Sequence, residues 1–161
     1  MGTQKCYLFG AGPGLDILDY DTIEHPRYVI NLAALVVPEY AGIITTDYHM
    51  LRYFERKKVQ NKIYTFSSRH SFDLNLEYVD SFVPIYCRVY SATTAIAILF
   101  HLGFDITAYG FDSVRGVEGY ASSIKMVCND FTNLNRKTDH KDIIKLINKY
   151  QERVGKYVNW M

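Results

Sequence analysis

A glycine-rich turn near the start of the chain has residue types that suit contact with a phosphate or a ribose. Residues 10–16 (GAGPGLD) directly follow the apolar run 5–9. Glycine allows close backbone approach to a ligand, and Pro13 suits the first position of a helix, where its missing N–H costs nothing. We expect ligand contacts from Gly10, Ala11, Gly12 and Pro13. The alternative is a tight strand-to-helix turn without a ligand.

The same turn argues against a dinucleotide cofactor. The dinucleotide fingerprint needs a third glycine, but this chain has Leu15 at that position. It also needs an acidic residue at the end of the next strand, where this chain has Asn31. NAD and FAD are therefore disfavoured. The Asn31 amide can donate and accept hydrogen bonds toward a base or ribose, although asparagine is also a common turn former.

A second segment, residues 88–112, combines a predicted buried helix with a strand that ends in an acid. The N–H groups and dipole at a helix start attract anions, and Arg88 stands just before this one. Ser91 is a suitable helix cap. In this segment we expect Arg88 to be catalytic, by stabilising a departing phosphate, and we expect nucleotide contacts from Ser91, Ala92, Thr93, Gly110 and Asp112.

His140 stands just before the last predicted helix and after a long polar stretch. A histidine there is well placed to act as a general base, and the alternative is an exposed helix start. No pair of histidines or cysteines has the spacing of a zinc site, so we expect no structural metal.

The predicted elements alternate between strands and helices. Strands are expected at 5–9, 27–31, 42–45, 62–66 and 106–109, with an edge strand at 157–160. Helices are expected from Asp47 to Arg56, from Ser91 to Gly103, and from about Asp142 onward. Residues 67–80 are interpreted as a loop, 82–87 as extended, and 113–137 as a long loop that could form a lid.

This pattern predicts one α/β domain over residues 1–161, a Rossmann-like parallel sheet with helices on both faces and ligands at the carboxyl ends of its strands. The chain is 48% hydrophobic and carries a net charge of +1. Such a charge gives no case for nucleic acid as the main partner. Three cysteines, no signal-peptide pattern and no apolar run of membrane-spanning length favour a soluble, cytoplasmic protein. The sequence leaves open whether copies assemble into a homo-oligomer.

Several segments together resemble the family 42 bacterial sialyltransferases and the related DUF115 group. That group includes motility accessory proteins and archaeal 6-hydroxymethylpterin diphosphokinases. The resemblance rests on GAGPGLDILD, YVIN, RVYSATTAIAILFHLGF, YGFD and HKDIIKL, in this order along the chain. Each segment is short, and the chain is shorter than the sialyltransferases.

The resemblance implies a modified Rossmann fold that binds CMP-sialic acid and transfers the sugar without a metal. It implies that Asn31 contacts the nucleotide, that Arg88 and Ser91 lie near the phosphate or the donor carboxylate, and that His140 deprotonates the acceptor. The chain departs from the family pattern at Ala11, at Gly14 and at Ala92, which follows Ser91. These departures bear on the sugar and the acceptor more than on the fold.

Three functions stay open at the sequence level. The leading hypothesis is a protein that binds a small-molecule CMP-sugar-type nucleotide, needs no cofactor and, if active, transfers the sugar with His140 as the base. The second is a magnesium-dependent pterin or nucleotide diphosphokinase, with the metal held by Asp112 or Asp16. The third is a non-catalytic binding or assembly protein with a degenerate site.

Overall fold

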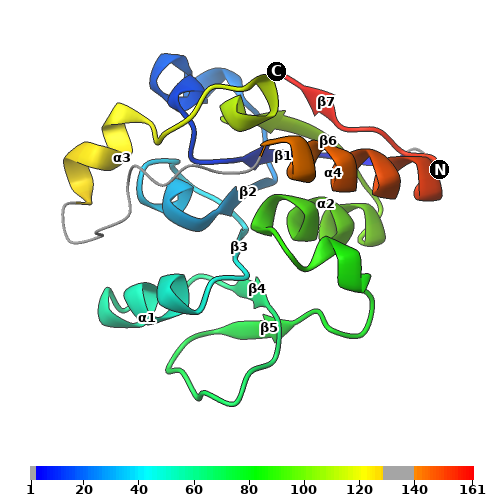
Figure 1. Cartoon of the computed structure of the whole chain (residues 1–161). Helices are drawn as coiled ribbons and strands as arrows, with labels where there is room; N and C mark the ends of the chain where they lie inside the picture. The colour runs from blue at the N-terminus through cyan, green and yellow to red at the C-terminus, as the bar shows by residue number, and fades with distance from the viewer. Residues whose placement is uncertain (1–2, 129–139) are drawn as a thin grey trace.

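The computed structural model describes residues 3–128 and 140–161, with the backbone alone described at residue 140. Within these residues, seven strands form one sheet in the order β5-β4-β3-β2-β1-β6-β7 (Figure 1). Every neighbouring pair is parallel. The strands are β1 (Gln4–Phe9), β2 (Arg27–Ile30), β3 (Gly42–Ile44), β4 (Ile63–Thr65), β5 (Leu76–Tyr78), β6 (Phe104–Tyr109) and β7 (Asn159–Trp160). The predicted parallel α/β fold is confirmed.

Helices cover both faces of this sheet. The α-helices are α1 (Tyr48–Arg56), α2 (Ser91–His101), α3 (Ser122–Val127) and α4 (His140–Val154). The 3-10 helices are η1 (Pro13–Ile17), η2 (Tyr20–Thr22), η3 (Asn31–Leu35), η4 (Ile85–Cys87) and η5 (Asp112–Arg115). Helices α2 and α4 pack with one hydrophobic cluster, and α1, α3 and η3 pack with the other.

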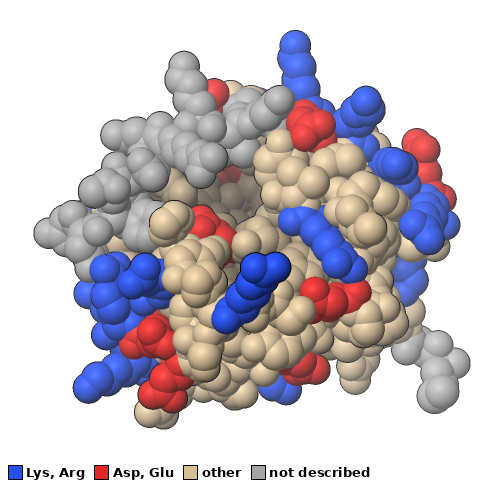
Figure 2. All heavy atoms as spheres, turned by 60° about the horizontal axis from the view of Figure 1, so that its bottom comes forward, with Lys and Arg blue, Asp and Glu red and all other residues tan. Residues whose placement is uncertain are grey.

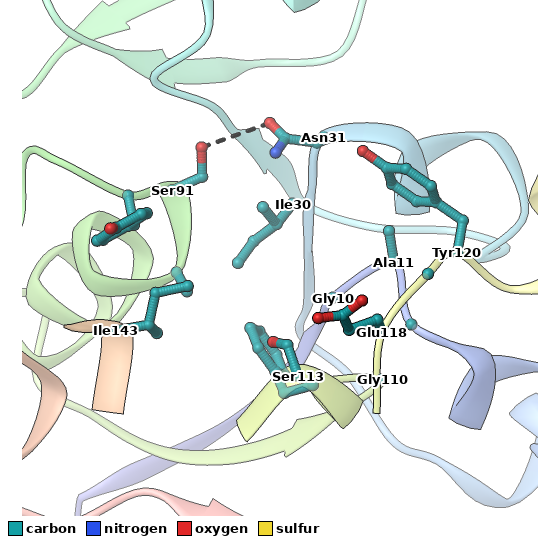
Figure 3. Close-up of a pocket in the computed structure, with 15 residues that line it drawn as sticks. Gly10, Ala11, Ile30, Asn31, Ser91, Gly110, Ser113, Glu118, Tyr120 and Ile143 are labelled. Carbon is teal, nitrogen blue, oxygen red and sulfur yellow. Dashed lines mark hydrogen bonds between the residues drawn. The ribbon is translucent and has the colours of Figure 1, made fainter. Parts of the chain in front are cut away.

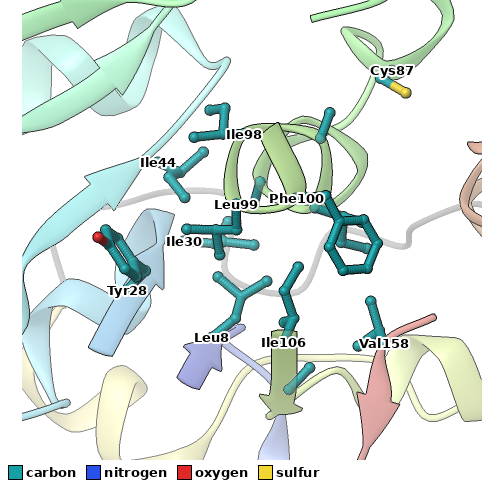
Figure 4. Packing of buried hydrophobic residues seen from close by; sticks show 14 of the residues in the cluster. Leu8, Tyr28, Ile30, Ile44, Cys87, Ile98, Leu99, Phe100, Ile106 and Val158 are labelled. Atoms are coloured by element: carbon teal, nitrogen blue, oxygen red, sulfur yellow. The ribbon is translucent and has the colours of Figure 1, made fainter. Parts of the chain in front are cut away.

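The strands feed both clusters because successive side chains point to opposite faces. In β1, Leu8 faces α2 and Phe9 faces the opposite layer. Helix α2 is apolar all round, as the sequence predicted, because it lies between the sheet and α4. Figure 4 shows Leu99 of α2 above Ile30 and Leu8. This packing seats α2 against β2 and β3.

Three elements differ from the sequence prediction. Residues 67–80, interpreted as a loop, contain the short edge strand β5, which pairs with β4. Residues 82–87, expected to be extended, form a turn and η4, with Pro84 at its start. Residues 113–128 contain most of η5 and the helix α3, while the rest of the proposed lid lies outside the described residues. The predicted strand at the carboxyl terminus is confirmed as β7.

The strand order creates a switch point beside β1. From β1 the chain moves outward through β2, β3 and β4 to β5, and α2 then returns it to β6 on the other side of β1. In open α/β sheets, ligands bind outside the carboxyl ends of the strands at such a reversal. No helix of the described residues combines the length and apolar character needed to cross a bilayer.

Candidate functional site

A cavity of about 220 Å³ lies at the switch point, outside the carboxyl ends of β1, β2 and β6 (Figure 3). Its lining comes from the glycine turn after β1, the end of β2, the start of α2, the segment after β6, and α4. The lining residues are Gly10, Ala11, Gly12, Ile30, Asn31, Tyr90, Ser91, Ala92, Gly110, Phe111, Ser113, Glu118, Gly119, Tyr120 and Ile143. Seven of these were expected from the sequence: Gly10, Ala11, Gly12, Asn31, Ser91, Ala92 and Gly110.

The glycines allow the ends of β1 and β6 to approach each other closely. Gly10 donates its backbone N–H to the Tyr109 carbonyl at 2.8 Å, and Gly12 donates to the Gly110 carbonyl at 2.8 Å. A Cβ at Gly10 would lie 2.8 Å from the Gly110 carbonyl oxygen, and Gly110 itself has a φ of +73°. The turn therefore needs glycine for its own construction, and Gly10 and Gly12 also line the cavity.

Asn31 begins η3 directly after β2, in a left-handed conformation with φ of 50°. Asparagine tolerates this conformation better than most residues, and such strain is often found at binding sites. The Ser91 hydroxyl lies 3.5 Å from the Asn31 side-chain oxygen and accepts from the Thr46 N–H at 3.1 Å. Ser91 therefore links the ends of β2 and β3 to α2.

The sequence prediction that Ser91 caps α2 is wrong. Tyr90 occupies the cap position, and no described side chain caps this end of the helix. The Tyr90 hydroxyl instead donates to the Asp142 carboxylate of α4 at 2.8 Å. The first N–H groups of α2 therefore lie at the edge of the cavity without a capping side chain, which is the arrangement that anion sites use.

Thr93 is also turned away from the cavity. Its hydroxyl donates to the Cys87 carbonyl at 2.7 Å, and the neighbouring Thr94 hydroxyl does the same at 2.7 Å. Both threonines are buried. They tie η4 to the first turn of α2 and are structural residues.

Arg88, expected near the phosphate, is directed into the turn that precedes it. Its guanidinium donates to the Val83 carbonyl at 3.0 Å and to the Asp80 carbonyl at 2.6 Å. It also lies over the Phe66 ring, 5.1 Å from the ring centroid. The irregular turn leaves these carbonyls without strand or helix partners, and Arg88 satisfies them. It does not line the cavity.

Asp112 and Pro13 help to build the glycine turn and do not line the cavity. The Asp112 carboxylate accepts from the Gly14 N–H at 2.9 Å. Pro13 is the first residue of η1, as expected from its missing N–H. Asp16 accepts from the N–H groups of Ser122 and Ser123, and the bond from Ser123 is the largest cause that holds the Asp16 pKa below its usual value.

Both carboxylates that the magnesium hypothesis needs are thus bound to backbone N–H groups. Across residues 3–128 and 141–161, no three His, Cys, Asp or Glu side chains gather closely enough to hold a metal ion. The hypothesis would therefore require the substrate phosphates to supply most of the metal ligands.

His140 is the first residue of α4, and its side chain lies outside the described residues. The structure places Ile143, three residues later in α4, in the cavity lining. His140 therefore stays a prediction as the general base.

Sequence reasoning missed four further lining residues: Phe111, Ser113, Glu118 and Tyr120. These residues lie in a stretch without clear periodicity, so no sequence pattern pointed to them. Glu118 is exposed at the rim, and Figure 3 shows its carboxylate turned toward the cavity. No Lys or Arg lines the cavity in the part of the chain that the structure describes. On the face shown in Figure 2, basic and acidic side chains are intermixed.

Comparison of the chain with protein-family models, with curated proteins and with solved structures finds no match. The function must therefore be argued from the site itself.

Proposed function

We propose that the cavity binds a pyrimidine nucleotide of the CMP type, with its phosphate at the start of α2. The observation that carries this proposal is that three features open on one cavity at the switch point. They are the uncapped amino end of α2, the glycine turn after β1, and Asn31 at the end of β2. Backbone N–H groups at a helix start bind phosphate without a basic side chain. The proposed phosphate site therefore does not need Arg88, whose guanidinium donates to the carbonyls of Val83 and Asp80.

The size of the cavity indicates which part of a ligand it takes. Pockets for drug-sized ligands typically span about 300–1,000 Å³, and this cavity is smaller, at about 220 Å³. We expect it to hold the nucleoside monophosphate part of a nucleotide-sugar, with the sugar lying outside. The resemblance to the sialyltransferases, which use a CMP-linked donor, supports the choice of cytidine.

The further step, metal-independent sugar transfer, follows from the same placement. Departure of the sugar leaves negative charge on the phosphate, and the amino end of α2 would stabilise this charge. His140 would take the proton of the acceptor hydroxyl. Arg88 has no part in this proposal, because it is bonded to backbone carbonyls.

The binding step is tested by thermal shift and calorimetry with CMP, CDP, CTP, UDP, GDP, ATP, NAD and CMP-sialic acid, each with and without magnesium. A ligand that binds the native state raises the unfolding midpoint by mass action. Stabilisation by cytidine nucleotides without magnesium supports the proposal. Stabilisation only by ATP with magnesium would favour the diphosphokinase, and no stabilisation by any ligand would refute the proposal.

The location of the phosphate is tested with Ala92→Asp. An acidic residue in the first turn of a helix stabilises the helix, while its charge at the cavity edge would repel the phosphate. We expect CMP affinity to fall by roughly tenfold or more, since a charged contact is worth over about 1.4 kcal/mol. The matched control, His49→Asp, changes the same position of α1, outside the cavity. Equal CMP affinity in both variants would refute this location.

A non-catalytic binding protein is the second candidate, favoured by the bonding of Arg88 to the turn instead of the cavity. An assay that incubates the protein with CMP-sialic acid and follows the release of CMP distinguishes this role from that of a transferase. Release that is lost in His140→Ala, while CMP affinity is kept, supports transfer. Binding of CMP without any release, with or without acceptor sugars, supports the non-catalytic role.

A further inference from the structure

The cavity has two chemically different sides. On one side lie the uncapped start of α2, Ser91 and Asn31, which suit an anion and polar ligand groups. On the other side lie Glu118 and Ser113, separated from the Asn31–Ser91 pair across the cavity in Figure 3. A carboxylate repels a phosphate but accepts hydrogen bonds from hydroxyl groups. The cavity therefore suits a ligand that is anionic at one end and rich in hydroxyl groups at the other.

We propose that Glu118 binds the ribose hydroxyl groups of the nucleotide and makes the cavity select ribonucleotides over 2′-deoxyribonucleotides. The proposal rests on the proposed function and names its substrate class. In the dinucleotide-binding proteins of this architecture, an acidic residue after the second strand binds the ribose. Here that position is Asn31. Among the described residues, the carboxylate in the cavity lining belongs to Glu118, which follows β6 and not β2.

The neighbours of Glu118 fit this role. Ser113 lies on the same side of the cavity as Glu118 in Figure 3, and the lining also includes the aromatic residues Phe111 and Tyr120. Aromatic faces pack against the apolar faces of sugars and bases, while a carboxylate accepts from two adjacent hydroxyl groups at once. The phosphate would then lie across the cavity, toward α2, away from the negative charge.

The test measures the ratio of two affinities, because this ratio responds to the 2′-hydroxyl alone. Calorimetry with CMP and dCMP is carried out on the unchanged protein, on Glu118→Ala and on Glu118→Gln. Since Glu118 is exposed, solvent weakens its bonds, and we expect the unchanged protein to prefer CMP by roughly tenfold. In Glu118→Ala this preference should disappear, because the 2′-hydroxyl of CMP loses its partner. CMP should then bind this variant no more tightly than dCMP does. Glu118→Gln, which keeps one acceptor oxygen, should lie between the two.

The control variant is Glu24→Ala, which removes an exposed loop carboxylate outside the cavity and should keep the preference for CMP. An unchanged ratio in Glu118→Ala, or equal affinity of the unchanged protein for CMP and dCMP, would overturn the proposal.

Cytidine and 2′-deoxycytidine separate this proposal from the proposed function. Discrimination between these two nucleosides without measurable binding of CMP would overturn the phosphate site and support the role of Glu118. Binding of none of the four compounds would overturn both.

Discussion

Replacement of Gly12 by alanine should destabilise the protein through contact with the end of β6. Gly12 has φ of −78° and ψ of 169°, a backbone conformation that alanine adopts readily. The cost therefore comes from packing alone. A Cβ at Gly12 would lie 2.6 Å from the Gly110 carbonyl oxygen and would overlap the Asp112 carboxylate.

The magnitude has three parts. Displacing Asp112 removes its bond to the Gly14 N–H, and a half-buried bond to a charged group is worth about 1–2 kcal/mol. Moving the backbone away from Gly110 adds about 1–3 kcal/mol, as for other overpacked sites. The lower entropy of the unfolded alanine chain returns about 0.4–1 kcal/mol. Together these parts predict that the free energy of unfolding falls by about 1–5 kcal/mol.

The assay is urea unfolding followed by circular dichroism and linear extrapolation. Gly14→Ala is the matched control, because its Cβ would lie 3.1 Å from the two Asp112 oxygens and so needs only a small movement of a side chain. The control should change the free energy of unfolding by less than about 1 kcal/mol. If Gly12→Ala is no less stable than Gly14→Ala, the close approach of β1 and β6 is not what requires glycine here.

Three further predictions concern the core and buried ionisable groups. Leu99→Ala, at a fully buried position of α2, should lower the free energy of unfolding by about 3–5 kcal/mol. Leu102→Ala, at the 47% exposed residue that follows α2, should change it by less than about 0.5 kcal/mol. Similar values for the two variants in urea unfolding would contradict the packing of α2. Arg27→Lys should lower the free energy of unfolding by more than about 2 kcal/mol. The buried Arg27 guanidinium donates to three backbone carbonyls in a geometry that a lysine cannot match. If the variant is as stable as the unchanged protein, these hydrogen bonds are dispensable. Burial raises the pKa of Cys6 to about 12 and of Cys87 to about 11, above the ordinary 9.0. As the pH rises, the thiols therefore ionise in the unfolded protein before they ionise in the folded protein. Their contribution to the free energy of unfolding is fully present below pH 9 and should be lost as the pH rises from 9 toward 12. Urea unfolding at pH 8 and pH 10 checks this, and a Cys6→Ala variant should show a smaller loss.

The sheet could be predicted from the sequence because its central strands are apolar runs bounded by turn residues. Strands β2 and β3 are buried throughout, and half of the residues of β1 and β6 are buried. The Asp47 side chain accepts from the His49 N–H at the start of α1, as its position indicated. In contrast, β5 was missed because Leu76–Tyr78 is a short edge strand with no buried residue. Pairing with β4, which is a tertiary contact, is what makes it a strand.

The candidate site was predictable where a residue type suits its place next to a strand or helix end. The glycine turn was found because glycine allows close backbone approach, and Asn31 because its amide follows a strand and can hydrogen-bond a base or ribose. Arg88 was misplaced because its partners are carbonyls of a turn that the sequence did not reveal. Ser91 was read as a cap, but its hydroxyl bonds with Thr46 from another strand end. Glu118 gave no signal, since the fold alone brings it to the cavity.

The central claim is that a cytidine nucleotide binds between the glycine turn and the start of α2. It is tested most directly by titrating CMP into ¹⁵N-labelled protein and following the amide resonances. The claim predicts saturable shifts at Gly10, Gly12 and Ser91, with little change at Gly103, which lies at the opposite end of α2. No saturable shift at millimolar CMP, or shifts that gather away from these residues, would contradict it.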